Sequence, residues 1–317
     1  MSAPRRPPRR QVDGVLLLDK PAGPSSNQAL QQARRLFNAE KAGHTGTLDP
    51  FATGLLPVCF GEATKFSADL FDADKRYVAT ARLGETTDTG DNEGHVVQRR
   101  DVAVSDEAIE CALAAFRGDI TQIPPMYSAL KRDGKPLYAY AREGIALERE
   151  ARAVRIAHLQ LMQRKGNDIV FDVTCSKGTY IRVLAQDIGE ALGCGAHLVA
   201  LRRVGVGALS IADAVTLEAL QALDTDRRDA CLQPPDCLVA TLPRVQLSDA
   251  DTARLLHGQP VAQQGEPAAR CRLFAPEGRF LGIGRWRNDG LLAPDRLIRT
   301  GMLHETGDQS QKNSCAP

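Results

Sequence analysis

Hydrophobic and polar residues alternate along residues 168–176, DIVFDVTCS. Four apolar side chains, from Ile169 to Cys175, fall on one side of this stretch and mostly polar residues fall on the other. A strict period of two predicts a half-buried, antiparallel strand. In the following residues, IRVLAQDIGEALG, the apolar positions are spaced three and four apart, which predicts an amphipathic helix that stops at Gly193.

The spacing of apolar residues also predicts a buried strand and two capped helices further upstream. Residues 12–23, VDGVLLLDKPAG, indicate a buried strand closed by a Pro-Gly turn, and Ser25 or Ser26 can cap the helix that follows. Ser105 can cap a second helix, which has acidic residues in its first turn and ends at Gly118.

Strands and helices therefore mix along the chain without a regular βαβ rhythm. This order favours the α+β (mixed α/β) class over a doubly wound fold. The 317 residues suit one large domain plus a small one. Prolines cluster around residues 234–248, and a short helix over 248–257 and several short strands, such as RFLGIGRW, follow them. We therefore expect a separate, small β-rich domain at 244–303.

Both ends of the chain are polar. Residues 1–11 carry four arginines among prolines and small residues, and we expect a disordered basic arm, with contact to phosphates as the alternative. Residues 304–317 are also expected to be disordered. The apolar run at 15–18 is stopped at once by Asp19 and Lys20, so we expect neither a signal peptide nor a membrane span.

Composition narrows the function classes. The chain is 43% hydrophobic and 25% charged, with a formal net charge of +1, so any binding to nucleic acid must come from local patches and shape. None of the eight cysteines forms a CxxC pair. This pattern favours reduced thiols and a cytoplasmic location, and it suggests neither a zinc site nor a closely spaced disulfide framework.

Residues 43–54, GHTGTLDPFATG, form a loop with unusual chemistry. It is not a phosphate-binding P-loop, because Gly46 is followed by Thr47 and Leu48 instead of the GK[ST] ending. Asp49 before Pro50 is typical of a helix start, so a structural cap and a functional carboxylate are both open for Asp49. His44 can be a loop histidine with satisfied hydrogen bonds. The polar loop at 87–94, TDTGDNEG, departs from a calcium loop in its glycine position and lacks the twelfth-position Glu.

Two cationic segments are candidates for binding. In SKGTYIR (176–182), Lys177 and Arg182 lie near the start of the predicted helix, where the helix dipole disfavours cations. Arg182 is therefore expected to face a carboxylate or a phosphate, with a solvated side chain as the alternative. Residues 122–144 interleave three tyrosines with lysines and arginines, a pattern that suits unpaired bases and phosphates, although such tyrosines can also simply pack a loop.

Taken together, these segments resemble the successive motifs of the bacterial TruB family, the tRNA pseudouridine synthases that modify uridine 55 in the T-loop. The resemblance covers residues 12 to 203, and FLGIGRWRNDGLLAPDRLI resembles a small PUA-type RNA-binding domain. The motifs are GVLLLDKPAGPSSN, KAGHTGTLDPFATGLLPVCFGEATK, DKRYVATARLGETTDTGDNEG, QIPPMYSALKRDGKPLYAYAREG and CSKGTYIRVLAQDIG.

This resemblance implies a catalytic domain at 12–243 around a bent antiparallel sheet, with an RNA-binding insertion at about 122–150. It implies that the catalytic residues are Asp49, Tyr77, Tyr180 and Arg182. It implies that the residues binding substrate or RNA are His44, Thr45, Leu201, Lys20, Tyr127 and Lys131, with Lys20 structural or a backbone contact rather than catalytic. Asp49 would act as nucleophile or as base, and Arg182 would be its partner cation.

The implied reaction breaks the N1–C1′ glycosidic bond of uridine and joins C5 to C1′ after the base has turned. It needs neither a cofactor nor a metal, and the base must first be flipped out of the T-loop. The expected partner is the T-stem-loop of tRNA, and the expected state is a monomer. The alternative is a non-catalytic RNA-binding or tRNA-folding protein with the same fold, which the presence of Asp49 and Arg182 disfavours.

Overall fold

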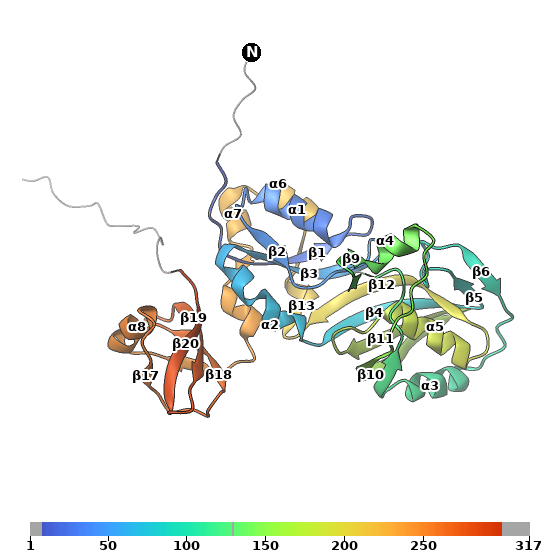
Figure 1. Ribbon diagram of the computed structural model, residues 1–317. Coiled ribbons are helices and arrows are strands. Elements are labelled where there is room, and N and C mark those ends of the chain that lie inside the picture. Colours follow the sequence, from blue (N-terminus) through green and yellow to red (C-terminus); the bar gives the residue numbers. More distant parts are fainter. Residues whose placement is uncertain (1–7, 129, 300–317) are drawn as a thin grey trace, which may run out of the picture. The chain divides into compact units, whose positions relative to one another are not determined.

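The structure, a computed structural model, describes residues 8–128 and 130–299 (Figure 1). Contacts divide the chain into two compact units, with the division between Thr241 and Leu242. This position lies close to the domain boundary expected from the prolines. Each unit has its own sheet and its own hydrophobic core.

An eleven-stranded sheet forms the centre of the first unit. Its main path is β14 (Val215–Thr216), β1 (Gly14–Lys20), β3 (Thr53–Phe60), β12 (Ala196–Val206), β4 (Lys75–Leu83), β11 (Asp168–Cys175), β10 (Arg152–Lys165) and β7 (Gly118–Gln122). The short strands β2 (Ala42–His44), β13 (Leu209–Ser210) and β15 (Leu232–Gln233) pair with β3, β12 and β1. Most neighbours are antiparallel, and the pairs β1–β14 and β3–β12 are parallel.

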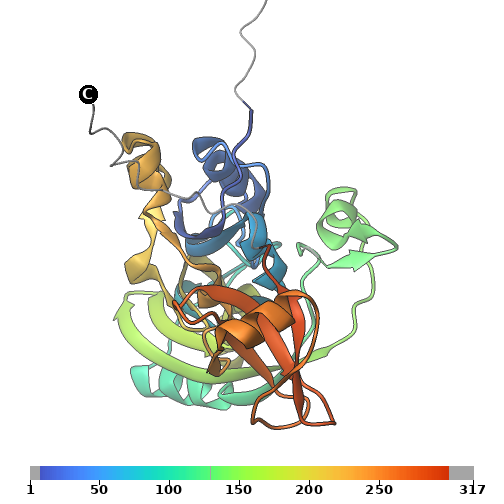
Figure 2. The same cartoon turned by 90° about the vertical axis from the view of Figure 1, so that its left-hand side faces the viewer.

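The long strands of this sheet are strongly curved, as β10 and β11 show in Figure 2. The register between β10 and β11 shifts twice, and the register between β12 and β4 also shifts twice. Such bulges increase the local bend and twist of a sheet. The mixed fold around a bent, largely antiparallel sheet is therefore as predicted.

Helices cover the sheet over two separate cores. The helices α3 (Asp106–Ala115) and α5 (Ile181–Ala191) contribute to a core with β4, β10, β11 and β12. The helices α1 (Ser26–Leu36) and α6 (Leu217–Ala222) contribute to a second core with β1 and β3. Shorter helical segments are α2 (Ser67–Phe71), α7 (Thr225–Asp229), η1 (Gly61–Phe66), η2 (Ile211–Asp213) and η3 (Pro235–Val239).

The expected helix starts are found. Ser25, one of the two candidates, caps α1 by accepting a hydrogen bond from the backbone of Gln28, whose side chain bonds back to the Ser25 backbone. This reciprocal capping box satisfies two backbone donors at the helix start. Ser105 caps α3 in the expected way. The alternating strand and the amphipathic helix after it are β11 and α5.

Two small sheets lie outside the main one. The hairpin of β5 (Glu85–Thr87) and β6 (Val96–Arg99) encloses the polar loop at 87–94. The hairpin of β8 (Lys131–Arg132) and β9 (Lys135–Pro136) leads into α4 (Leu137–Arg142), and together these elements occupy the expected insertion. In the insertion, cations lie over tyrosine rings: Lys135 over Tyr140 and Arg142 over Tyr138.

The second unit is the β-rich domain that the sequence predicts. Its five strands run in the order β16 (Arg244–Gln246), β18 (Arg270–Phe274), β19 (Phe280–Trp286), β20 (Leu291–Leu297) and β17 (Val261–Ala262). Helix α8 (Asp249–Leu256) contributes Leu255 to the core of this unit. The indole of Trp286 donates a hydrogen bond to the carbonyl of Gln263, so the single tryptophan is satisfied as well as buried.

Part of the predicted N-terminal arm contacts the first unit. The guanidinium of Arg10 pairs with Asp229, and its backbone exchanges hydrogen bonds with Asn38 and Glu40. Residues 8–11 therefore differ from the disordered arm that the composition indicates. Residues 1–7, and the predicted tail at 304–317, lie outside the described residues.

The backbone at Gly54 excludes any larger residue. Its φ is +103°, and an added Cβ would lie 2.3 Å from the carbonyl oxygen of Arg203 on β12. We expect Gly54→Ala to lower the free energy of unfolding by about 2 kcal/mol or more, through strain and overpacking. Gly43→Ala is the matched control, since its Cβ would meet nothing within 4 Å. Equal urea midpoints for the two variants would contradict this expectation.

Candidate active site

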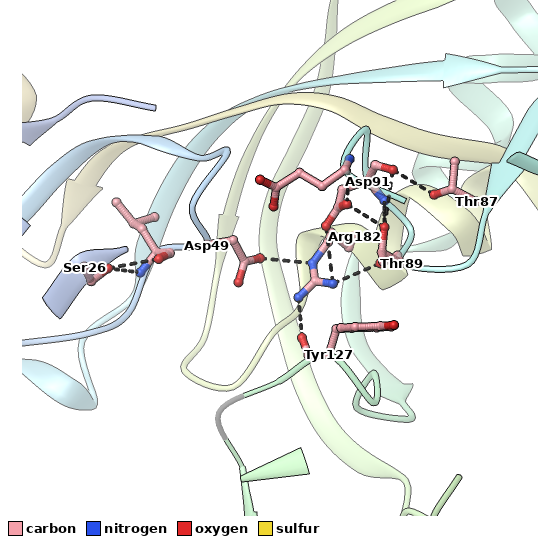
Figure 3. Close-up of polar contacts among 9 residues, drawn as sticks. Ser26, Asp49, Thr87, Thr89, Asp91, Tyr127 and Arg182 are labelled. Carbon is pink, nitrogen blue, oxygen red and sulfur yellow. Dashed lines mark hydrogen bonds and ion pairs between the residues drawn. The ribbon is translucent and has the colours of Figure 1, made fainter. Parts of the chain in front are cut away.

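Asp49 lies in a loop between β2 and β3 that is held from several sides. The hydroxyl of Ser26 accepts a hydrogen bond from the backbone N–H of Leu48 (2.7 Å) and donates one to its carbonyl (2.9 Å) (Figure 3). Leu48 and Ala52, on either side of Asp49, are buried in the core that β4, β10, β11 and β12 form with α3 and α5. No helix follows Asp49, because β3 begins at Thr53. The helix-cap interpretation of the Asp-Pro pair was therefore wrong, and the carboxylate is free for other contacts.

Lys20 binds the backbone of the same loop. Its fully buried ammonium donates hydrogen bonds to the carbonyls of Pro21 (2.8 Å) and Pro50 (3.2 Å), and the N–H of Gly23 also donates to Pro50. Burial lowers the pKa of Lys20 to about 8, and the charge of Asp49 opposes this shift. The side chain is therefore placed to hold the loop by its backbone, as expected for a structural role.

Arg203 is a third support, which the sequence analysis did not single out. Its side chain is 1% exposed and donates to the carbonyls of Leu55 (2.7 Å), Gly46 (3.2 Å) and Thr47 (3.5 Å). A guanidinium can bond several carbonyls at once because its five N–H groups form a planar fork. The sequence carried one signal for this role, the arginine pair directly after Leu201 in the strand.

Arg182 faces Asp49 directly. Its Nε lies 3.0 Å from Oδ2 of Asp49, and the arginine side chain is 4% exposed while that of Asp49 keeps 37% (Figure 3). The other nitrogens of Arg182 are also engaged: Nη1 donates to the carbonyl of Thr89 (2.9 Å) and lies 3.5 Å from Oδ2 of Asp91, and Nη2 donates to the carbonyl of Tyr127 (2.6 Å). The anion expected for this arginine is thus a carboxylate.

Asp91 is the second carboxylate of the site and was missed in the sequence. Its Oδ1 accepts hydrogen bonds from the hydroxyl of Thr89 (2.5 Å) and the N–H of Glu93 (3.1 Å), and its carbonyl accepts one from the hydroxyl of Thr87 (2.8 Å). These contacts fold the loop at 87–94 so that the buried Asp91 reaches Arg182. A loop that looked merely polar therefore carries part of the site.

Burial raises the pKa of Asp49 above its ordinary value. The charge of Arg182 opposes this rise, the neighbouring carboxylate of Asp91 adds to it, and Lys20 opposes it. Asp49 is thus a partly buried carboxylate that is paired with a fixed cation, Arg182. This combination is frequent at reactive positions.

Tyr77, Tyr180 and Leu201 come from three elements. Tyr77 lies on β4, paired in register with Arg203 of β12, and is packed against the core that includes Leu201 and Leu48. Burial raises the pKa of both tyrosines, Arg203 opposes this for Tyr77, and the charge of Asp49 adds to it in each case. The hydroxyls of Tyr77 and Tyr180 are therefore harder to ionise than that of a free tyrosine.

His44 and Thr45 lie at the start of the loop. Nδ1 of His44 accepts a hydrogen bond from the N–H of Gly46 (3.4 Å), and burial together with Arg203 lowers the pKa of this histidine. His44 therefore presents a neutral ring. Thr45 is buried, so its side chain would need a change in the loop to touch RNA directly.

Tyr127 and Lys131 lie in the insertion. Tyr127 reaches the site through its backbone carbonyl, which accepts from Arg182, and its ring is half-buried. Lys131 begins β8 and is exposed. Lys177, at the corner before α5, pairs with Asp72 on the surface and takes no part in this cluster.

Family models match nearly the whole described chain. The N-terminal domain of TruB family pseudouridylate synthases matches residues 34–181. A tRNA pseudouridylate synthase B C-terminal domain matches residues 182–240, and a C-terminal model of pseudouridine synthase II TruB matches residues 243–298.

Individual proteins agree with these matches. The chain is 58% identical over 303 residues to the tRNA pseudouridine synthase B of Burkholderia mallei (strain NCTC 10247), covering 92% of this chain and 99% of that protein. It is 59% identical over 296 residues to the tRNA pseudouridine synthase B of Azoarcus sp. (strain BH72), covering 93% and 98%. A chain of a solved Cbf5-Nop10-Gar1 complex is similar in structure, with a TM-score of 0.67, 28% identity, and 89% and 81% of the two chains covered.

The fold and the sequence are thus those of a pseudouridine synthase, an enzyme that isomerises uridine to pseudouridine. Within that class, the chain belongs to the TruB family. In the part of the chain that the structure describes, no helix is long and apolar enough to cross a membrane.

The role of Arg203 can be separated from that of its neighbour. We expect Arg203→Lys to lower the free energy of unfolding by about 1–3 kcal/mol, because a single ammonium nitrogen cannot replace the three guanidinium nitrogens that each bond a different carbonyl. It should also slow single-turnover pseudouridine formation, since the Asp49 loop loses a support. Arg202→Lys is the control: Arg202 is more exposed and pairs with Asp19, so unfolding should change by roughly 0.5 kcal/mol or less. Similar losses in both variants would argue against a specific role.

The second carboxylate should control the pH dependence. If Asp49 acts ionised, activity rises with pH through its raised pKa. Asp91→Asn removes a like charge and leaves more of the Arg182 charge to Asp49, so the pKa of Asp49 falls. We therefore expect the acid limb of the single-turnover rate to move to lower pH. Asp88→Asn, at an exposed position in the same loop, should leave the limb in place. An acid limb that moves upward in Asp91→Asn would refute this assignment.

Proposed function

We propose that this protein isomerises uridine to pseudouridine at position 55 in the T-loop of tRNA. The observation that carries the proposal is the partly exposed carboxylate of Asp49, fixed at 3.0 Å by the buried guanidinium of Arg182. Relatives 58% and 59% identical over most of the chain bear the name tRNA pseudouridine synthase B, which supports tRNA as the substrate. The resemblance of the ordered motifs to the TruB family supports the T-loop uridine.

The reaction needs a charged group in a shielded pocket. The N1–C1′ bond breaks, the uracil turns, C5 bonds to C1′, and the proton on C5 is lost while N1 gains one. Asp49 acts as an ionised carboxylate, either as nucleophile or as the base that removes a sugar proton. Arg182 keeps it charged and oriented, since a paired cation opposes the effect of burial on the pKa.

The residues around Asp49 receive the flipped base. Tyr77 stacks on the uracil, Leu201 forms an apolar wall, and Tyr180 lies against the base and assists the removal of the C5 proton. Tyr77 and Leu201 belong to the same packed core, which keeps their surfaces fixed while the base turns. A base within a folded loop cannot reach such a pocket, so the nucleotide is flipped out of the RNA.

RNA binding is assigned to surfaces around the pocket. His44 fills the gap in the RNA stack, with Thr45 beside it, and Lys20 fixes the loop that carries both. Tyr127 and the exposed Lys131 belong to the insertion at 122–150, where cations and aromatic rings suit phosphates and bases. The β-rich domain at 244–303 adds PUA-type contacts to RNA, and the enzyme acts as a cytoplasmic monomer.

Tritium release tests the proposal. A tRNA transcript labelled at C5 of uridine should release tritium with the wild-type protein, because the C5 proton is lost during isomerisation. Asp49→Asn, which keeps the shape but not the charge, should abolish release while tRNA affinity stays within about threefold. A transcript in which the T-loop uridine is replaced by cytidine serves as the substrate control.

Each alternative outcome has a distinct meaning. Continued release from the transcript without the T-loop uridine would reject position 55 and keep the isomerase. Absence of release by a folded protein that binds tRNA would favour the non-catalytic RNA-folding protein. Loss of binding in Asp49→Asn would make that aspartate structural.

A further inference from the structure

Gln122 makes an unusual pair of hydrogen bonds. It is the last residue of β7, and its side chain is only 3% exposed. Its Oε1 accepts a hydrogen bond from the N–H of Tyr180 (3.0 Å), and its Nε2 donates one to the carbonyl of the same residue (3.3 Å). The side-chain amide therefore binds both polar groups of a single residue, as a neighbouring strand would.

The backbone of Tyr180 determines how α5 begins. It is the N-cap residue of α5, with extended backbone angles (φ −103°, ψ 109°), and its own side chain makes no capping hydrogen bond. The helix that starts after it carries Arg182 in its first turn. Fixing the Tyr180 backbone therefore fixes the directions of two side chains that border Asp49.

Gln122 also lies at the start of the insertion. Five residues after Gln122, the carbonyl of Tyr127 accepts the 2.6 Å hydrogen bond from Arg182. The start of the insertion is thus joined to the start of α5 twice, once through the Gln122 amide and once through the Arg182 guanidinium. Because the two attachments are close along both segments, loss of one changes the geometry of the other.

We propose that Gln122 is a positioning residue for Tyr180 and Arg182, which links the root of the RNA-binding insertion to the catalytic pair. This inference rests on the proposed function, since it assigns those two residues to the reaction. Glutamine suits the place because its amide offers a neutral donor beside an acceptor at any pH. An ionised glutamate accepts but cannot donate, and methionine fills the space with neither group.

The substitution Gln122→Met removes the hydrogen bonds of this side chain and keeps its packing. Gln122→Met should lower the single-turnover rate at saturating enzyme by about tenfold or more, as expected for misplaced catalytic groups. The Kd for tRNA should change by about threefold or less, because the phosphate-binding surface is untouched. Thr121→Ala is the control, since Thr121 is the exposed neighbour on β7. Urea unfolding gives the folded fraction of each variant, to which its rate is normalised.

Gln122→Glu adds a signature that a packing role would not produce. When protonated, the introduced carboxyl can accept from the Tyr180 N–H and donate to its carbonyl, as the amide does; when ionised, it faces that carbonyl with a negative charge. Burial raises the pKa of such a group. Arg152 is the register partner of Gln122 on β10, and its positive charge lowers the pKa of the introduced carboxyl. The charge of Arg182 also lowers this pKa, and the negative charge of Asp49 raises it.

The expected result is a pH-dependent rescue. The ratio of the Gln122→Glu rate to the wild-type rate should rise as the pH falls from about 9 to about 5. The same ratio for Gln122→Met should stay flat, because no group there titrates. Taking ratios cancels the titration of Asp49 where its pKa is unchanged, as expected for the uncharged Gln122→Met. In Gln122→Glu the added charge would raise the pKa of Asp49 and lower the ratio at low pH, so a rising ratio reports the rescue against this opposing effect.

The outcomes distinguish the inference from the proposed function. No tritium release by the wild type would reject the function itself. Wild-type release together with an unimpaired Gln122→Met, or with a Gln122→Glu ratio that does not vary with pH, would reject the positioning role. Losses of rate and affinity in equal measure would likewise reject it, since they would place Gln122 in RNA binding.

Discussion

The ion pair between Arg182 and Asp49 is the contact on which the rest of the site depends. A guanidinium that is 4% exposed is stable only when its hydrogen-bonding groups are satisfied. Arg182 meets this demand with two carboxylates and two backbone carbonyls, drawn from three segments outside its own helix. The loop at 87–94, the loop at 45–52 and the root of the insertion must therefore all converge on α5. The stability of the buried charge thus imposes the arrangement of the whole site.

A second buried arginine has a different task. Arg203 binds carbonyls of the Asp49 loop and of β3, so it fixes backbone while Arg182 fixes a carboxylate. Lys20 and Ser26 act on neighbouring peptides of the same loop. These contacts go to backbone atoms, so the loop can be held without occupying the carboxylate. Asp49 is left paired with Arg182 while its side chain stays partly exposed.

Much of the fold followed from periodicity in the sequence, because period and capping are local properties. The alternation in β11, the spacing in α5 and the Ser25 cap all depend on residues within a few positions of one another. The awkward charge of Arg182 at a helix start also gave a correct expectation of an anion. The Asp-Pro pair misled because a local preference for a helix start was overridden by the buried Leu48 and by the pairing of β3.

The missed residues share one property: their roles depend on contacts distant in sequence. Asp91 reaches Arg182 across 91 positions, and Arg203 reaches Gly46 across 157. Gln122 contacts Tyr180 across 58 positions, and nothing in its own neighbourhood predicts a buried amide. Such pairs are determined by the order of strands in the sheet, which periodicity does not specify.

Under the proposed function, this arrangement would link RNA capture by the insertion to the chemistry at Asp49 without a large movement. The insertion contacts the Asp49 site through its backbone, because the carbonyl of Tyr127 accepts a hydrogen bond from Arg182. A displacement of the insertion that withdraws the Tyr127 carbonyl leaves a buried guanidinium N–H unpaired, which is unfavourable. The guanidinium would then turn toward its remaining acceptors and alter its approach to Asp49. The displacement is passed directly to the contact with Asp49, because the guanidinium is planar and rigid and one nitrogen cannot move without the other two.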